Sequence, residues 1–124
     1  MIRVEHTFNL PGRCAVVCVA GEVDVATVAA VEDGLRRAVA AAPCAVVCDL
    51  RRVTFFAVAG FHCLERAMDD LERLGTPLHL VVAGDAMRSP VLRLALPTVP
   101  WPVHHSIDEA VNSVLSSTSS SHGS

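Results

Sequence analysis

The side chains of this 124-residue chain best suited to chemistry are thiols, because the pentapeptide Cys-Ala-Val-Val-Cys occurs twice. Four cysteines at equal spacing suggest a zinc site. The two copies run from Cys14 to Cys18 and from Cys44 to Cys48, and both are continuous apolar runs typical of buried β-strands. Strand residues four apart are separated by about 13 Å, at roughly 3.3 Å per residue, whereas zinc holds each sulfur at about 2.3 Å. Neither copy can hold one metal ion with both thiols, so we predict no metal site.

The same cysteines have two other interpretations. If the two strands are neighbours in a sheet, Cys14 lies near Cys44 or Cys18 lies near Cys48, and either is a candidate redox pair. Buried cysteine also behaves as a small apolar residue, and disulfides are uncommon in a reducing cytoplasm. We therefore favour a role in the core. The fifth thiol, Cys63, falls near the start of a predicted helix, where burial opposes any gain in reactivity from the helix dipole.

Other catalytic patterns are not found in the sequence. His104 and His105 are adjacent, but neighbours in an extended segment point in opposite directions. All ten basic residues are scattered arginines. This excludes enzymes that need a phosphate-loop or Schiff-base lysine and provides no basic stripe for nucleic acid. We therefore predict a protein that is not an enzyme, uses no cofactor and does not bind nucleic acid.

Apolar runs alternate with amphipathic segments along the chain. Strands are predicted at residues 2–8, 14–20, 44–50 and 78–82, with a short one at 103, and Pro11-Gly12 is predicted to form a turn. Helices are predicted at residues 26–42, 59–74, 89–96 and 106–115. This alternation predicts an α/β fold with a mostly parallel sheet and an antiparallel strand at its N-terminal edge.

The composition, 52% hydrophobic, suits one domain over residues 1–115, followed by a serine-rich segment, 116–124, that we expect to be disordered. The longest apolar stretch, residues 39–48, contains a proline and is far shorter than the roughly 20 residues that span a bilayer. No signal peptide is recognisable in residues 1–5. We therefore expect a cytoplasmic protein that does not enter a membrane.

The segment from Phe55 to Phe61 joins a predicted strand to a predicted helix, yet none of its side chains can form a hydrogen bond. The first amides of a helix usually find side-chain oxygens as acceptors. The small residues of this segment either face a partner or pack inward. We predict that Phe56 and Phe61 are not both buried, which would leave an apolar surface here.

Three stretches resemble the STAS domain, which bacterial anti-sigma factor antagonists share with the tails of sulphate transporters. Residues 19–27 read Val-Ala-Gly-Glu-Val-Asp-Val-Ala-Thr, and residues 47–56 read Val-Cys-Asp-Leu-Arg-Arg-Val-Thr-Phe-Phe. The third stretch is the helix after Ser89-Pro90, followed by Ser-x-x-Glu-Ala at residues 106–110. The likeness covers residues 2–115. It implies four or five strands, helices mostly on one face, and a partner that is an anti-sigma factor with a serine-kinase fold.

The resemblance also implies that phosphorylation of one serine, within Asp-Ser-Ser-Gly, ends the binding of that partner. In this chain the four places are taken by residues 57–60, Ala-Val-Ala-Gly, so Ala59 occupies the phospho-acceptor position without a hydroxyl. Asp24 matches a family acidic residue near that position, although it also suits a helix cap. The predicted partner-binding residues are Asp24, Phe56, Ala57, Val58, Ala59, Gly60, Phe61 and His62.

The sequence and its resemblance to the STAS domain leave two candidate functions of different classes. The first is a protein-binding regulator that resembles an anti-sigma factor antagonist, acts on transcription through a sigma factor, and lacks the usual phosphorylatable serine. The alternative is a structural or sensory STAS subunit that assembles with other STAS domains or binds a small ligand. A homodimer is a further candidate, and the sequence leaves the identity of the partner open.

Overall fold

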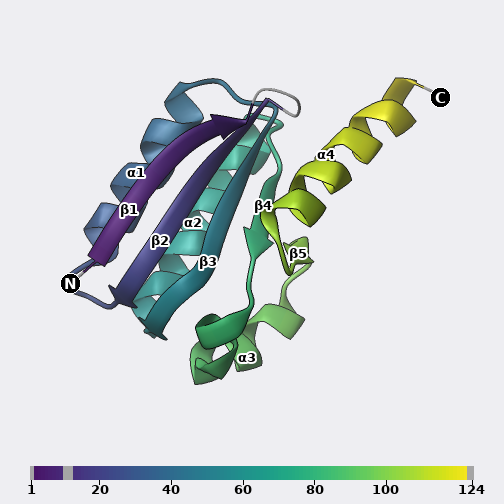
Figure 1. Cartoon of the computed structure of the whole chain (residues 1–124). Coiled ribbons are helices and arrows are strands. Elements are labelled where there is room, and N and C mark those ends of the chain that lie inside the picture. Colours follow the sequence, from purple (N-terminus) through teal and green to yellow (C-terminus); the bar gives the residue numbers. More distant parts are fainter. Residues whose placement is uncertain (1, 10–12, 123–124) are drawn as a thin grey trace.

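The computed structural model describes residues 2–9 and 13–122, which form a five-stranded sheet in the order β1-β2-β3-β4-β5 (Figure 1). The strands are β1 (Ile2–Asn9), β2 (Cys14–Val23), β3 (Ala45–Phe56), β4 (Leu78–Val81) and β5 (Val103–His104). The helices are α1 (Val28–Ala40), α2 (Val58–Arg73), η1 (Gly84–Arg88), α3 (Pro90–Ala95), η2 (Leu96–Thr98) and α4 (Ile107–His122). β1 is antiparallel to β2 and every other pair is parallel, which confirms the predicted fold class.

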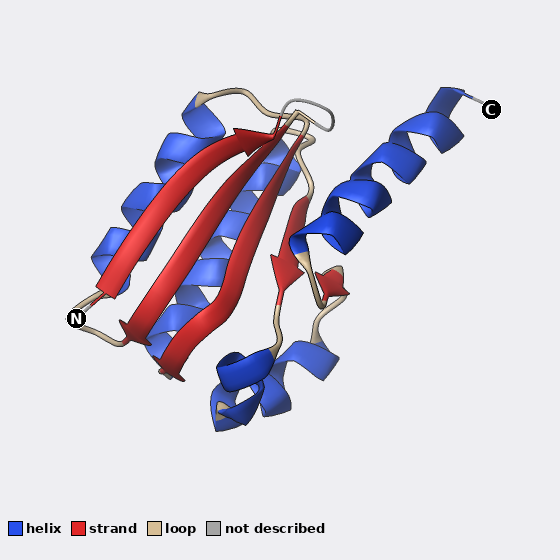
Figure 2. Ribbon diagram, viewed as in Figure 1, coloured by secondary structure: helices blue, strands red, loops and turns tan. Residues whose placement is uncertain are grey.

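Two apolar cores lie on opposite faces of the sheet, because successive strand residues point to opposite sides. The larger core packs α1 and α2 behind the sheet and includes Val17, Cys48 and Leu80 (Figure 2). The smaller core packs Ala110, Val111 and Val114 of α4 against strand residues on the other face, which are Cys14, Val16, Ala45, Val47 and Val81. Burial on both faces explains why the central strands are apolar without alternation.

The strands β2 and β3 are longer than the sequence indicated, and this changes the junction before α2. We expected the second buried strand to end at Leu50 and an apolar loop to follow, but β3 continues to Phe56. It can do so because β2 also continues, and the two stay paired up to Val23 and Phe56 through two shifts of register. Only Ala57 separates β3 from α2.

Two helix starts agree closely with their sequence signals. Ser89 caps α3, its Oγ accepting the Leu92 N–H at 3.4 Å, with Pro90 at the first helical position. Ser106 Oγ accepts the Glu109 N–H at 3.1 Å, and the Glu109 carboxylate accepts the His105 N–H at 2.7 Å. These contacts satisfy amides that the helices leave without partners, as a capping box does.

At the C-terminal end, α4 runs to His122, so the helix extends past residue 115 into the serine-rich segment that we expected to be disordered. Residues 116–122 contain neither glycine nor proline, the residues that most oppose helix. The predicted Pro11-Gly12 turn lies outside the residues that the structure describes. Within those residues, no helix combines the length and the apolar character needed to cross a bilayer.

Gly60, in the first turn of α2, lies where the helix approaches the sheet most closely. A Cβ at this position would come within 2.7 Å of Val23 Cγ1 and 3.0 Å of Phe56 Cζ. Real Cβ atoms do not approach other carbons so closely, and the β-branched valine has little freedom to move away. The first turn of α2 therefore packs on the sheet through a residue without a side chain.

We expect Gly60→Ala to lower the free energy of unfolding. Overpacking costs about 1–3 kcal/mol, which outweighs the gain in helix propensity of about 1 kcal/mol. Urea unfolding followed by circular dichroism measures the change. Ala59→Ser, a comparable enlargement at the neighbouring half-buried position, is the control and should change stability little. Equal stability of Gly60→Ala and the wild type would contradict the packing described.

Candidate protein-binding site

The site predicted from the sequence lies where β3 passes into α2. Ala57 is extended, with φ −85° and ψ 166°, and its carbonyl accepts the Gly60 N–H at 3.0 Å. No side chain caps α2. Within the described chain, the N–H groups of Val58 and Ala59 have no protein acceptor. The helix therefore starts with free donors among apolar side chains, as the sequence suggested.

The three phenylalanines around this junction have different surroundings. Phe56 is 2% exposed and belongs to the larger core, whereas Phe55 is 50% exposed on the opposite face of β3. Phe61 is half-buried, and its ring lies 5.2 Å from the ring of Trp101. Of the residues that we expected to contact a partner, Phe56 and Gly60 are inside the molecule. The side chain of Phe56 belongs to the core under α2, and Gly60 of α2 packs against Val23 and Phe56.

Val58 is the most exposed apolar residue of α2's first turn, at 57%. Its neighbour across the junction is the turn that follows β2, because the Ala57 N–H donates to the Val23 carbonyl at 2.8 Å. That turn carries Val25, which is 80% exposed. We use the term apolar end surface for Val25, Phe55 and Val58. The sequence analysis missed Val25 and Phe55, although Val25 directly follows Asp24.

Asp24 organises the turn between β2 and α1. Its Oδ1 accepts the N–H groups of Ala26 and Thr27, both at 3.0 Å, and the Thr27 hydroxyl at 3.1 Å. The carboxylate thus holds the chain as it enters α1, which is the structural role expected from its position before the helix. By fixing this turn, Asp24 also determines where Val25 lies.

His62 lies on the exposed side of α2, one turn into the helix. Its Nδ1 is 2.9 Å from Glu65 Oε1, a contact between residues three apart on a helix surface. It therefore lies at the edge of the apolar end surface as a solvent-facing histidine. Ala57 and Ala59 are both half-buried, so their methyl groups add little to the exposed area.

The cysteines do not form the pairs that repeated spacing suggested. The register pairs Cys14 with Ala45 and Cys48 with Val17, so Cys18 and Cys48, one of the two candidate redox pairs, point to opposite faces of the sheet. Cys14 and Cys44 do lie near each other, at the adjoining ends of the two strands. None of the five cysteines forms a disulfide.

Burial decides the reactivity of these thiols. It raises the pKa of Cys63 to about 11, with a further contribution from the nearby Glu32 carboxylate. Burial likewise raises the pKa of Cys48 far above its ordinary value, and that of Cys14 to a smaller extent. Since only the thiolate is nucleophilic, these groups are inert in the folded protein. Cys44 is the exposed thiol.

We therefore expect a thiol reagent such as dithionitrobenzoate to modify Cys44 of the native protein first. Cys48 and Cys63 should react only after unfolding, because both are buried and protonated. The absorbance of the released thionitrobenzoate gives the number of modified thiols as a function of time. Cys44→Ser should remove the fast phase and Cys63→Ser should leave it; the reverse result would show that α2 does not cover Cys63.

A part-buried ion pair on the sheet face beside α4, between Asp49 and Arg51, was not found from the sequence. The Asp49 carboxylate accepts the Arg51 Nε and Nη2 groups, each at 2.9 Å, and the Arg51 backbone N–H at 3.0 Å. Burial by itself raises the pKa of Asp49, but the hydrogen bonds and charge of Arg51 outweigh it and lower the pKa below its ordinary value. The pair lies at the point where the register between β2 and β3 shifts, between Cys18 and Ala20.

His79, which is buried, and His104, which is half-buried, form a contact that joins β4 to β5. Nδ1 of His79 and Nε2 of His104 are 3.0 Å apart and the rings are stacked. His105 points outward, as expected for neighbours in an extended segment. Burial, and secondarily the nearby His104, lower the pKa of His79 below its ordinary value of 6.5. His79 is thus stable in the fold as the neutral imidazole.

The lowered pKa predicts a pH-dependent stability. The unfolded chain binds a proton at His79 near pH 6.5, and the folded chain binds it only at lower pH, so stability is complete above about 6.5 and falls as the pH drops below it. Urea unfolding at a series of pH values from about 7.5 to about 5 gives the free energy of unfolding at each pH, and so measures this slope. His79→Val should flatten the slope, whereas the exposed His6→Gln should keep it. An unchanged slope in His79→Val would contradict the assignment.

Taken together, the described residues form a small α/β domain whose notable exposed feature is apolar rather than catalytic. They contain no group of three or more histidine, cysteine or acidic side chains placed to hold a metal ion. The family model for the STAS domain matches residues 7–110. This chain therefore belongs to the STAS domain family.

Several solved structures share this fold. An anti-sigma factor antagonist from Mycobacterium paratuberculosis is 28% identical, with 92% of this chain and 94% of that chain covered and a TM-score of 0.78. SpoIIAA in its unphosphorylated form is 20% identical, with 92% and 97% covered and a TM-score of 0.67. SpoIIAA of Bacillus in the phosphorylated form is 20% identical, with 92% and 99% covered and a TM-score of 0.63. Among curated proteins, a sequence search gave no match.

Proposed function

We propose that this chain is a protein-binding regulator of the anti-sigma factor antagonist kind, and that phosphorylation at residue 59 does not control it. The observation that carries the proposal is the apolar end surface at the start of α2. The fold of the mycobacterial antagonist supports the general role, since it matches nearly the whole of both chains. The partner is an anti-sigma factor with a serine-kinase fold.

The apolar end surface supports binding because exposed large side chains are concentrated there. Val25, Phe55 and Val58 come from the carboxyl ends of two adjacent parallel strands and the helix that follows. A hydrogen bond from Ala57 to Val23 holds the two segments together. Exposed large apolar side chains at one end of a domain are typical of a contact between proteins. A partner would gain free energy by covering it, without any rearrangement of the backbone.

The absence of a hydroxyl at residue 59 supports the second part of the proposal. SpoIIAA exists in unphosphorylated and phosphorylated forms. A phosphate near a helix N-terminus adds about two negative charges and three acceptors, which would oppose an apolar contact. Ala59 cannot take that group. Binding in this chain is therefore controlled by the amount of protein or by another signal, and not at this position.

The test mixes the purified chain with candidate anti-sigma kinases from the same organism, in the presence of ATP. We expect a stable complex by calorimetry and no phosphate on the chain by intact mass spectrometry. Val58→Glu should weaken binding roughly 10- to 100-fold, since it places a charge in the buried contact. Leu94→Glu, which changes an exposed leucine of α3, is the matched control and should bind as the wild type does.

Two results would contradict the proposal. One is equal binding by Val58→Glu and the wild type, which would show that the partner contacts another surface. The other is the absence of a complex with any such kinase. An Ala59→Ser variant tests the control mechanism separately. It should accept phosphate and then bind more weakly, whereas phosphate uptake by the wild type with release of the partner would show a switch at a different residue.

A further inference from the structure

We propose that a hollow between α3 and β5 binds a small molecule with an apolar body and one carboxylate. The hollow has a volume of about 320 Å³. It lies beyond the carboxyl end of β4, and η1, α3, η2 and the segment leading into α4 enclose it. This site is separate from the apolar end surface, and the inference does not depend on the proposed function. Its lining residues are Val82, Met87, Leu92, Arg93, Leu96, Pro97, Val103 and His105.

The hollow has a rigid floor and an open rim. Val82 and Leu92 at the floor are core residues, each 1% exposed. Met87 and Val103 at the rim are 47% and 41% exposed, which is unusual for large apolar side chains that already line a concave surface. A ligand would cover the rim residues and contact the floor without opening the core. A volume near 300 Å³ and mainly apolar walls are typical of small-molecule sites.

The charge of the hollow selects the polar group of the ligand. Arg93 is the permanently charged residue in its lining, and no acidic residue lines it. Across the part of the chain that the structure describes, the Arg93 side chain has no ion pair or hydrogen bond. His105 Nδ1 is 3.8 Å from Glu109 Oε2, so the imidazole already faces a carboxylate. A guanidinium in apolar surroundings binds a carboxylate through two parallel hydrogen bonds.

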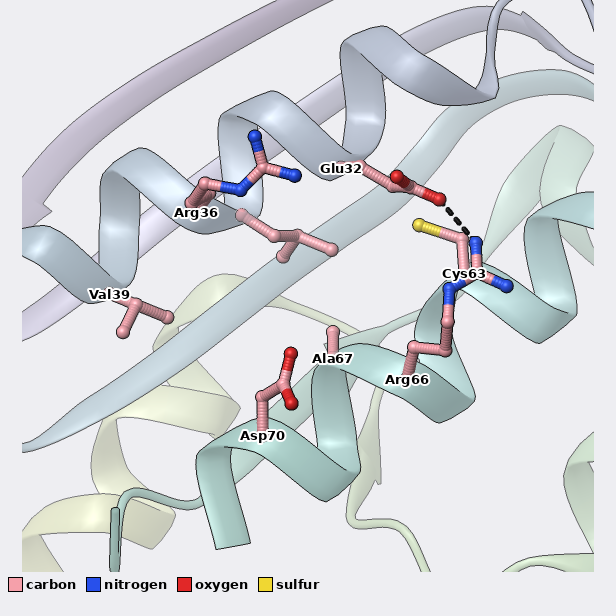
Figure 3. A pocket seen from close by; sticks show the side chains of 8 residues that line it. Glu32, Arg36, Val39, Cys63, Arg66, Ala67 and Asp70 are labelled. Carbon is pink, nitrogen blue, oxygen red and sulfur yellow. Dashed lines mark hydrogen bonds and ion pairs between the residues drawn. The ribbon is translucent and has the colours of Figure 1, made fainter. Parts of the chain in front are cut away.

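Other hollows lack this combination. The groove between α1 and α2, about 210 Å³, is lined by two carboxylates, Glu32 from one helix and Asp70 from the other, and Glu32 is paired with Arg66 (Figure 3). The hollow on the sheet face contains Asp49, whose charge is satisfied by Arg51. Carboxylates in their linings would repel an acid. The hollow beside α3 differs from both of them, because its lining has an arginine and no carboxylate.

The test uses octanoate as the probe, below its micelle concentration, with the full ¹⁵N-labelled chain. Amide chemical shifts should change around the hollow, at the backbone of Val82, Leu92 and Val103, and should saturate. Octanol should bind at least roughly tenfold more weakly, because it keeps the apolar body and loses the charge. Arg93→Gln should weaken octanoate binding by a similar factor. Arg52→Gln, which removes another exposed arginine, is the matched control and should have no effect.

A second variant tests the hollow itself. Leu96→Trp should fill it and abolish the shift changes while the remaining spectrum stays folded. Three results would overturn the proposal: no saturable shift changes with octanoate, equal binding of octanoate and octanol, or shift changes centred on the apolar end surface. Each of these leaves the binding of an anti-sigma kinase to be judged by its own experiment.

Discussion

The pairing of β2 with β3 up to Val23 and Phe56 is the interaction on which the rest of the site depends. Two register shifts keep these strands together beyond the point where their apolar runs end. The Ala57 N–H then bonds to the Val23 carbonyl, so the turn into α1 and the start of α2 lie side by side. Gly60 lets α2 approach this junction closely. The exposed positions of Val25 and Val58 are a consequence of that geometry.

The two faces of the sheet have different functions in the fold. The face behind α1 and α2 holds the larger core, while α4 covers only the apolar part of the opposite face. Beyond α4 that face contains the Asp49–Arg51 pair and the exposed Phe55. Buried charge pairs contribute little net stability, but removing one partner is costly. The polar part of this face is therefore organised around one arginine that neutralises one buried carboxylate.

Local sequence signals predicted the elements well where the signal is itself local. The caps at Ser89 and Ser106, the helix stripes and the antiparallel edge strand are all present. Predictions that needed the register between strands were less accurate. Cys18 and Cys48, one of the two candidate pairs, lie on opposite faces because a shift of one residue turns a side chain to the other face. The burial of Phe56 and the exposure of Phe55 follow from the same alternation of faces along β3.

The sequence by itself determined the α/β class, the apolar start of α2 and the absence of a hydroxyl at residue 59, because residue types and periodicity encode these directly. Only the tertiary structure decided which side chains are exposed. The ring that contacts His79 belongs to His104 on the next strand, and the register that brings the two together depends on all the packing at once. The same holds for the hollow beside α3, whose walls come from four separate segments.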